Sequence, residues 1–207
     1  MSQKFLNLKE EKKSAIINAA LKEFTKKGYE LASTNEIVEE AGISKGSLFH
    51  YFKNKQDLFL FLCSYTFNVV QEEFYNRIDT DNPDLLDRYR QSSILKMNIV
   101  LKYPGVFDFL LMLLSEEAGE VKPKIQESLD RITVAGYDKL FSNIDGSKFK
   151  SDYPAEKIKD IIVWSAEGYG NQLLKKIKGK SVAEIDMEAI ICDFDQYLDI
   201  LRDAFYR

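Results

Sequence analysis

The sequence is poor in the residues that punctuate strand-rich folds. Only 10 glycines and 4 prolines occur among its 207 residues. β-Sheets need many tight turns, and tight turns use glycine and proline heavily, so this shortage favours long helices. Apolar residues make up 45% of the chain and charged residues 30%, which excludes a wholly disordered chain and a collagen-like one.

Residues that carry catalytic or metal chemistry are also scarce. The chain has two cysteines, Cys63 and Cys192, whose separation matches no metal-ligand spacing. His50 is the one histidine, and the sequence contains no glycine-rich phosphate loop and no nucleophile elbow. We therefore expect no catalytic residue, no metal site and no cofactor, and we predict that the protein is not an enzyme.

Long apolar runs are missing as well. The most apolar stretch, residues 106–114, includes Asp108 and is far shorter than the ~18 residues of a membrane span. The first residues do not resemble a signal peptide. Together with two isolated cysteines, these features predict a cytoplasmic protein without a membrane partner.

Charge is distributed unevenly along the chain. Residues 1–60 hold 10 lysines and 8 acidic residues, whereas residues 61–207 hold 19 basic and 25 acidic residues. The net charge of −4 argues against indiscriminate coating of nucleic acid. A basic N-terminal part on an acidic body is compatible with a DNA contact at that end of the molecule.

Helix start and stop signals recur along the whole chain. Asn7, Ser44, Asn54, Asn82 and Ser181 stand where side-chain caps are expected, and prolines follow at first-turn positions. No stretch alternates as a strand would. We predict an all-α fold of about nine helices, with these approximate bounds: 7–28, 34–42, 44–51, from 54, 82–103, 105–115, from 123, 154–179, and 181 to the end.

The most informative stretch is residues 34–52, a helix, a glycine turn and a second helix, which is the helix-turn-helix arrangement. Ala41 is small where the helices cross, and Gly42 suits a backbone that a side chain would strain. The apolar faces that should hold the pair together are supplied by Ile37, Val38, Ile43, Leu48 and Phe52.

Residues 41–58, AGISKGSLFHYFKNKQDL, resemble the N-terminal signature of the tetracycline-repressor (TetR) family. Residues 16–29 resemble that family's first helix, so the similarity covers roughly residues 10–60. Phe49 stands where the family more often has Tyr, and Gln56 where it has Glu. The resemblance implies a DNA-binding domain (residues 1–53), a helical ligand-binding and dimerisation domain (residues 54–207), and a homodimer formed through the last two helices.

The resemblance also implies which residues contact DNA. Tyr51, Lys55 and Thr34 match positions that hold the phosphate backbone; the alternative is that Tyr51 is packed, Lys55 is solvated and Thr34 is a helix cap. The outward face of the second helix offers candidates for reading base edges in the major groove. These are Lys45, Ser47 and His50, with Ser44, Gly46 and Phe49 on the same surface.

The second half of the chain is rich in large apolar and aromatic residues. Most could simply form the core, but some could line an apolar pocket, and Trp164 and Tyr169 each bring a polar tip that could orient a ligand. The candidate ligand-binding residues are Phe67, Tyr103, Phe107, Met112, Tyr137, Trp164 and Tyr169.

The function predicted from the sequence is transcriptional regulation. The protein is expected to bind a palindromic operator in double-stranded DNA as a homodimer, and to be released by a small apolar or amphipathic effector. One alternative is a helical small-molecule carrier or enzyme with an accessory DNA-binding head. Another is a regulator of the same family that a protein partner controls. Repression is favoured over activation, and the operator and the effector stay open.

Overall fold

The computed structural model describes residues 3–116, 119–150, 152–177 and 184–207. Every regular element in these ranges is helical, and the only β-type pairing is an isolated bridge between Phe149 and Tyr206. The chain forms two compact units: unit 1 is residues 1–73 and 102–134, and unit 2 is residues 74–101 and 135–207. The all-α prediction is thereby confirmed.

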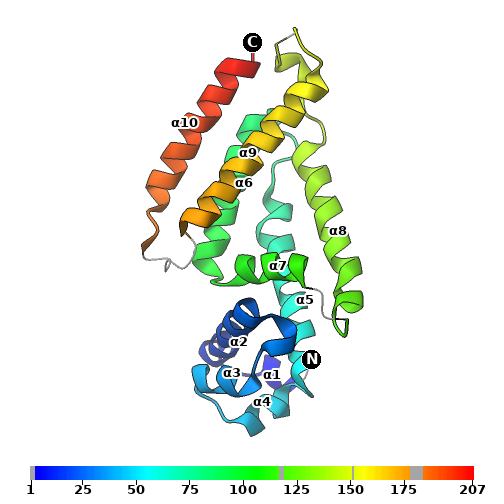
Figure 1. Ribbon diagram of the computed structural model, residues 1–207, viewed down its shortest axis with the longest axis vertical. Coiled ribbons are helices and arrows are strands. Elements are labelled where there is room, and N and C mark those ends of the chain that lie inside the picture. Colours follow the sequence, from blue (N-terminus) through cyan, green and yellow to red (C-terminus); the bar gives the residue numbers. More distant parts are fainter. Residues whose placement is uncertain (1–2, 117–118, 151, 178–183) are drawn as a thin grey trace. The chain divides into compact units, whose positions relative to one another are not determined.

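Figure 1 shows the helices of both units. They are α1 (Gln3–Leu6), α2 (Glu10–Leu31), α3 (Thr34–Glu40), α4 (Lys45–Tyr51), α5 (Lys55–Glu73), α6 (Leu85–Lys102), α7 (Val106–Ser115), α8 (Lys122–Phe141), α9 (Ala155–Ile177) and α10 (Met187–Phe205), with 3₁₀ turns η1 (Tyr75–Arg77) and η2 (Gly146–Lys148).

In unit 1, α7 packs against α2 and α5 around an aromatic centre. The ring of Phe59 lies 5.0 Å from that of Phe24 and 5.6 Å from that of Phe109, and all three side chains are fully buried. Gly28 interrupts α2 with a φ of 69°, and the next amide, that of Tyr29, donates a 2.7 Å hydrogen bond to Glu116 after α7. The predicted stop at Gly28 therefore marks a kink at which α7 is fastened to α2.

Unit 2 combines α6, the end of α8, α9 and α10, and α6 lies behind α9 in Figure 1. Its apolar core is formed by Leu85, Leu86, Phe149, Ile158, Ile162, Phe194, Leu198, Leu201 and Tyr206. Arg88 is also buried there, and its guanidinium donates hydrogen bonds to the carbonyls of Thr80, Asn82, Lys139, Leu140 and Ser142.

The predicted helix starts at Asn82 and Ser181 need correction. Asn82 does not cap α6: Asp84 does, because its Oδ1 accepts the amides of Leu86 (3.0 Å) and Asp87 (3.2 Å). Helix α10 begins at Met187 and is capped by Asp186; Ser181 lies outside the described residues. Both carboxylates were available as caps by residue type, but an earlier Asn or Ser offered the same chemistry.

The described ranges contain ten α-helices, one more than expected. The extra helix is α1, which has only four residues and no cap signal in the sequence. The asparagine predicted to open the first helix makes no cap, since α2 begins at Glu10 after Lys9 without a side-chain cap bond. No single described helix is long and apolar enough to cross a membrane, and only α6 and α7 taken together, bent at the break between them, reach that length and composition.

Candidate nucleic-acid interface

The turn between α3 and α4 is built by two residues with different roles. Gly42 has a φ of 64°, in the left-handed region that residues with a Cβ adopt at a cost. The Oγ of Ser44 accepts the amide of Ser47 at 3.1 Å and lies 2.9 Å from its hydroxyl. The predicted cap at the start of α4 is confirmed, and it gives α4 a fixed beginning after a fixed turn.

The inner faces of α3 and α4 are firmly packed. Ile37, Leu48 and Phe52 are at most 1% exposed, whereas Val38 and Ile43 are half-buried. The apolar residues chosen from the sequence therefore hold the two helices in place, with three of the five fully enclosed.

The outer face of α4 is left free by this packing. Lys45, Gly46, Phe49 and His50 are exposed, and Phe49 is an apolar side chain with 41% of its surface accessible. A Cβ added at Gly46 would meet only the Ser44 hydroxyl, at an ordinary 3.9 Å. No described neighbour therefore requires glycine at position 46. Because Gly46 has no side chain, the backbone of α4 stays uncovered at this point of the outer face.

Tyr51 packs against a residue of α1. Its ring meets that of Phe5 edge-on at 6.0 Å, and Phe5 itself is 1% exposed and packs on Phe52 (5.0 Å) and Phe61 (5.1 Å). Sequence reasoning missed Phe5. The only signal was an apolar pair, Phe5 and Leu6, within an otherwise polar N-terminus.

Lys55 is held more tightly than a solvated lysine. Its ammonium donates hydrogen bonds to the carbonyls of Glu30 (2.9 Å) and Ala32 (3.4 Å) and lies 4.8 Å from the centre of the Tyr29 ring. The side chain thereby joins the start of α5 to the end of α2. Burial raises the pKa of Tyr29 to about 12, so this ring stays neutral beneath the cation.

Thr34 and Ser47, the remaining candidates for DNA contacts, are half-buried. Thr34 is the first residue of α3 and Ser33 occupies the cap position before it, without a side-chain cap bond.

The start of α5 is capped by Asn54 and Asp57: the Asp57 amide donates to Asn54 (2.8 Å), and the Lys53 amide donates to the Asp57 carboxylate (3.0 Å). The predicted cap at Asn54 is confirmed.

Comparison with known proteins agrees with this geometry. Residues 16–62 match the family described as bacterial regulatory proteins, tetR family. The chain carries a TetR-family DNA-binding domain. It is 30% identical over 136 residues to the helix-turn-helix transcriptional regulator YerO of Bacillus subtilis, a match that covers 64% of this chain but only 45% of YerO.

Solved TetR-family structures show the same fold along the chain. A regulator from Chloroflexus aurantiacus superposes with a TM-score of 0.63, at 22% identity and with coverage of 100% of this chain and 98% of that one. FadR of Bacillus subtilis, solved in complex with stearoyl-CoA, superposes with a TM-score of 0.54, at 14% identity and with coverage of 90% and 96%. The chain thus combines a TetR-family DNA-binding domain with the overall fold of these solved regulators.

The candidate ligand residues of this chain fall into both units. Phe67, Tyr103, Phe107 and Met112 are half-buried in unit 1. Trp164 is 65% exposed on α9, so the described part of the protomer does not enclose it. Tyr169 donates a 2.7 Å hydrogen bond to Asp193 of α10, and its ring packs at a tilt against those of Phe194 and Tyr197. The Tyr137 side chain lies outside the described residues.

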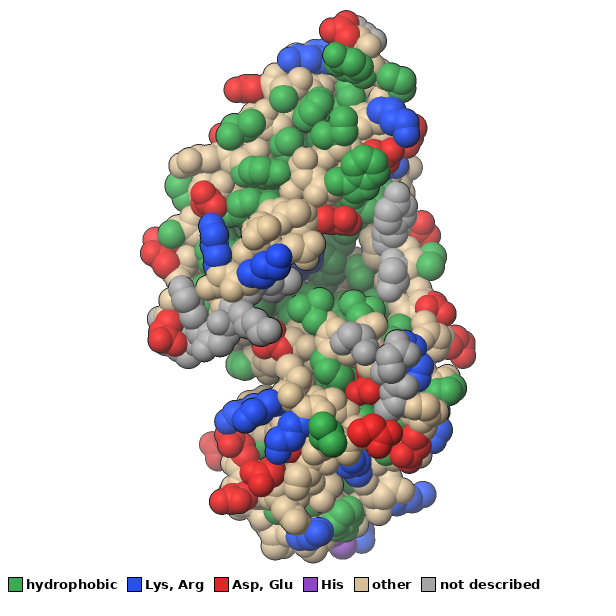
Figure 2. Space-filling model, viewed as in Figure 1, with side chains coloured by type: hydrophobic (Ala, Val, Ile, Leu, Met, Phe, Trp, Pro, Cys, Tyr) green, Lys and Arg blue, Asp and Glu red, His purple; other side chains and the backbone are tan. Residues whose placement is uncertain are grey.

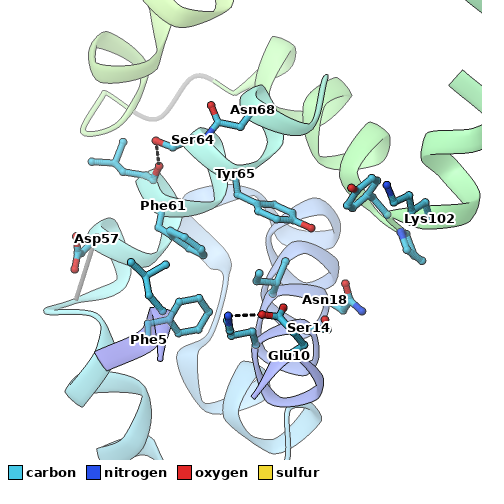
Figure 3. Close-up of a pocket in the computed structure, with 16 residues that line it drawn as sticks. Phe5, Glu10, Ser14, Asn18, Asp57, Phe61, Ser64, Tyr65, Asn68 and Lys102 are labelled. Carbon is cyan, nitrogen blue, oxygen red and sulfur yellow. Dashed lines mark hydrogen bonds and ion pairs between the residues drawn. The ribbon is translucent and has the colours of Figure 1, made fainter. Parts of the chain in front are cut away.

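Unit 1 also contains a groove of about 710 Å³, drawn in Figure 3. It lies among α1, α2, α5 and the turn before α7, and Tyr103 is the candidate ligand residue that lines it. Phe5, Phe61 and Tyr65 line its apolar wall, while Glu10 and Lys13 form an ion pair at its edge. Phe5, which packs against Tyr51, thus lines this groove as well.

The two cysteines lie in different environments. Cys63 is buried, which raises the pKa of its thiol to about 12, and Cys192 is exposed; neither is in a disulfide. In the described ranges no three His, Cys, Asp or Glu side chains are grouped so that they could hold a metal ion.

Proposed function

We propose that this TetR-family protein is a ligand-responsive repressor. It binds a palindromic operator as a homodimer and is released by a small apolar or amphipathic effector. Residues 1–53 act as the DNA-binding domain, and residues 54–207 bind the effector and form the dimer.

The observation that carries DNA recognition is the outer face of α4. Lys45, Phe49 and His50 project from a helix whose start, turn and inner face are fixed by other residues, and no described ion pair uses Lys45. Donors on a fixed helix, together with an apolar ring, suit base edges and a thymine methyl group. We also assign Thr34, Ser47 and Tyr51 to DNA contacts. Lys55 contacts phosphate only with the part of its ammonium that faces away from α2.

An apolar surface on unit 2 supports the dimer. Ile161 (41% exposed) and Trp164 (65%) lie on α9, and Ile200 (66%) lies on α10. Figure 2 shows apolar side chains gathered over this part of unit 2. Large exposed apolar groups on adjacent helices mark an interaction surface. The other apolar stripe of these helices is occupied, because Ile158, Ile162 and the residues of the unit 2 core face inward.

The effector proposal draws on a structural relative. FadR was solved with stearoyl-CoA, which joins a long apolar chain to a charged group. A ligand displaces the protein from DNA only if it binds the DNA-competent state more weakly than the alternative state. By linkage, operator DNA must then weaken effector binding by the same factor, about 5- to 150-fold.

The test begins with selection of DNA from a random pool by the purified protein. A palindromic consensus bound by two protomers supports the proposal; a consensus without symmetry, or no consensus, refutes it. Candidate amphiphiles are then titrated with and without saturating operator. If operator DNA left the dissociation constant of every tight binder unchanged, control by a ligand would be refuted in favour of control by a protein partner.

A further inference from the structure

The groove of unit 1 has the size of a small-molecule site. Its volume is about 710 Å³, and ligand pockets usually measure roughly 300–1,000 Å³. The lining includes Phe5 of α1, Ile17 of α2, Phe61 and Tyr65 of α5, and Tyr103 before α7. Phe5 and Ile17 are buried, so packed core residues fix part of the apolar wall.

The charged side chains that line this groove already have partners within unit 1. Glu10 pairs with Lys13 at 2.5 Å, and Lys102 pairs with Glu73 at 2.5 Å. The Asp57 carboxylate accepts a backbone amide at the start of α5, where the helix dipole favours negative charge. A charged ligand would therefore compete with existing contacts, whereas an uncharged ligand would leave them intact.

Neutral polar groups of the groove remain available to a ligand. Figure 3 shows the Tyr65 side chain projecting from α5 into the groove, and its hydroxyl forms no hydrogen bond with any described residue. Burial raises the pKa of Tyr65, so this hydroxyl stays protonated and can donate. Ser14, Asn18 and Asn68 also line the groove without a hydrogen-bond partner among the described residues.

We propose that this groove binds a small uncharged molecule with an aromatic body and a carbonyl or similar acceptor for the Tyr65 hydroxyl. The rings of Phe5, Phe61 and Tyr103 supply contacts for the aromatic body. The site differs from the effector site proposed for residues 54–207, because it includes residues of the DNA-binding domain.

A molecule in the groove should strengthen DNA binding. It would contact Phe5, whose ring lies 6.0 Å from that of Tyr51 and 5.0 Å from that of Phe52. Helix α1 has only four residues, and so short a helix has little stability of its own. The bound molecule would hold Phe5 against Tyr51, which is assigned to a DNA contact. This effect rests on the proposed DNA-binding function, whereas binding in the groove does not.

The test uses the full-length protein and Nile red, a neutral aromatic dye whose fluorescence rises in apolar surroundings. The competitors are 2-acetylnaphthalene and 2-naphthoate, which share a ring system and differ in charge at neutral pH. We expect the ketone to bind at least about tenfold more tightly, because the carboxylate would be desolvated without a free counter-charge. No dye binding, or equal affinities of the two competitors, would overturn the proposal.

Variants then assign the binding to the groove. Ser14→Trp places a large ring in the groove from an exposed position of α2 and should weaken ketone binding about tenfold or more. Lys12→Trp, at an exposed residue of α2 that does not line the groove, is the matched control and should bind as the unaltered chain. Tyr65→Phe keeps the ring and should weaken ketone binding about two- to tenfold through the lost hydrogen bond. Unchanged affinity in Ser14→Trp or Tyr65→Phe would refute the site.

The effect on DNA is measured separately, by titrating the ketone with and without saturating operator selected from the random pool. We expect operator to tighten ketone binding about fivefold or more, since coupling between two sites is reciprocal. Unchanged or weaker binding would refute the stabilisation of Phe5 by the ligand. Failure to select any operator would refute the repressor proposal, while the dye and ketone measurements would still decide whether the groove binds its ligand.

Discussion

Asp84 and Arg202 join two ends of unit 2 that lie 118 positions apart in the chain. Arg202 of α10 donates hydrogen bonds to both carboxylate oxygens of Asp84, at 3.0 and 3.3 Å. Lys148 (3.2 Å) and the Tyr206 hydroxyl (3.2 Å) donate to the same carboxylate, which is 4% exposed and also caps α6. A single buried carboxylate therefore connects the start of α6, η2 and the end of α10.

Replacing Asp84 with Asn should destabilise the protein markedly at pH 7. The substitution keeps the volume but leaves Arg202 and Lys148 without their counter-charge. The loss should approach the ~3–5 kcal/mol of a broken buried pair and stay below it, because both cations are more than one-third exposed. Urea unfolding measures it. Asp87→Asn, at an exposed partner of Arg202, is the control and should cost less than about 1 kcal/mol.

The stabilisation by Asp84 should also depend on pH. Burial acts to raise the pKa of Asp84, but hydrogen bonds from Arg202, the Asp87 amide and Lys148 outweigh it and lower the pKa. A carboxyl group with a depressed pKa stabilises the fold above its unfolded pKa of about 4, and this contribution is lost as the pH falls through the folded value. The stability difference between the unaltered chain and Asp84→Asn should therefore be constant near neutrality and shrink below about pH 4. A difference that grew in acid would contradict the assignment.

Replacing Phe5 with Ala should weaken both the fold and DNA binding. Removal of a buried phenylalanine costs ~3–5 kcal/mol in a closed core, and we expect the lower end because α1 is short. DNA affinity should fall as well, since Phe5 packs under Tyr51 and Phe52. Thermal unfolding and fluorescence anisotropy on a selected operator measure the two effects. Leu6→Ala, at a residue 46% exposed, should change neither by much.

Sequence reasoning recovered the parts of the fold that local chemistry determines. The break in helical geometry at Gly28, the cap at Ser44 and the cap at Asn54 each depend on residues within a few positions of one another. The exposed face of α4 could be predicted for the same reason. Helical periodicity separates inner from outer positions once the inner ones are apolar.

The features that escaped prediction depend on contacts between distant residues. The Asp84 cluster joins residues from α6 and α10, and nothing in either segment marks the pairing. Lys55 matched a phosphate-binding position, yet its bonds to the carbonyls of Glu30 and Ala32 depend on how α2 ends.

Substitutions of Lys45, His50 and Lys55 should distinguish residues that read bases from a residue that supports the fold. Lys45→Ala and His50→Ala should change the preferred sequence, at ~1–3 kcal/mol for each lost base contact, without altering stability, because both side chains are exposed. Lys55→Ala should lower thermal stability and weaken binding to all sequences alike, with a salt dependence reduced by about one unit of log–log slope. Binding to a panel of operators at several salt concentrations tests both. A shift of sequence preference in Lys55→Ala would reverse these roles.

Charge placed on the exposed apolar surface of unit 2 should prevent dimerisation. Ile200→Asp or Trp164→Glu puts a carboxylate where an apolar contact is proposed, while each side chain is at least 65% exposed in the protomer and its replacement leaves the fold intact. Analytical ultracentrifugation should show a dimer for the unaltered chain and a monomer for both variants. Val134→Asp, at a 61% exposed residue of α8, should stay dimeric. A monomer of the unaltered chain at micromolar concentration would refute the dimer.

Two glycines of the helix-turn-helix should respond in opposite ways to alanine. Gly42 has a φ of 64° with no atom near its missing Cβ, so Gly42→Ala should destabilise the protein by about 1 kcal/mol through backbone strain alone. Gly46 lies within α4 and has room for a Cβ, so Gly46→Ala should keep or raise stability by up to ~1 kcal/mol. If the outer face of α4 enters the major groove closely, the added methyl group should nevertheless weaken operator binding. Urea unfolding and operator titration of both variants measure this contrast, and a Gly46→Ala protein with full operator affinity would show that the backbone at position 46 does not approach DNA.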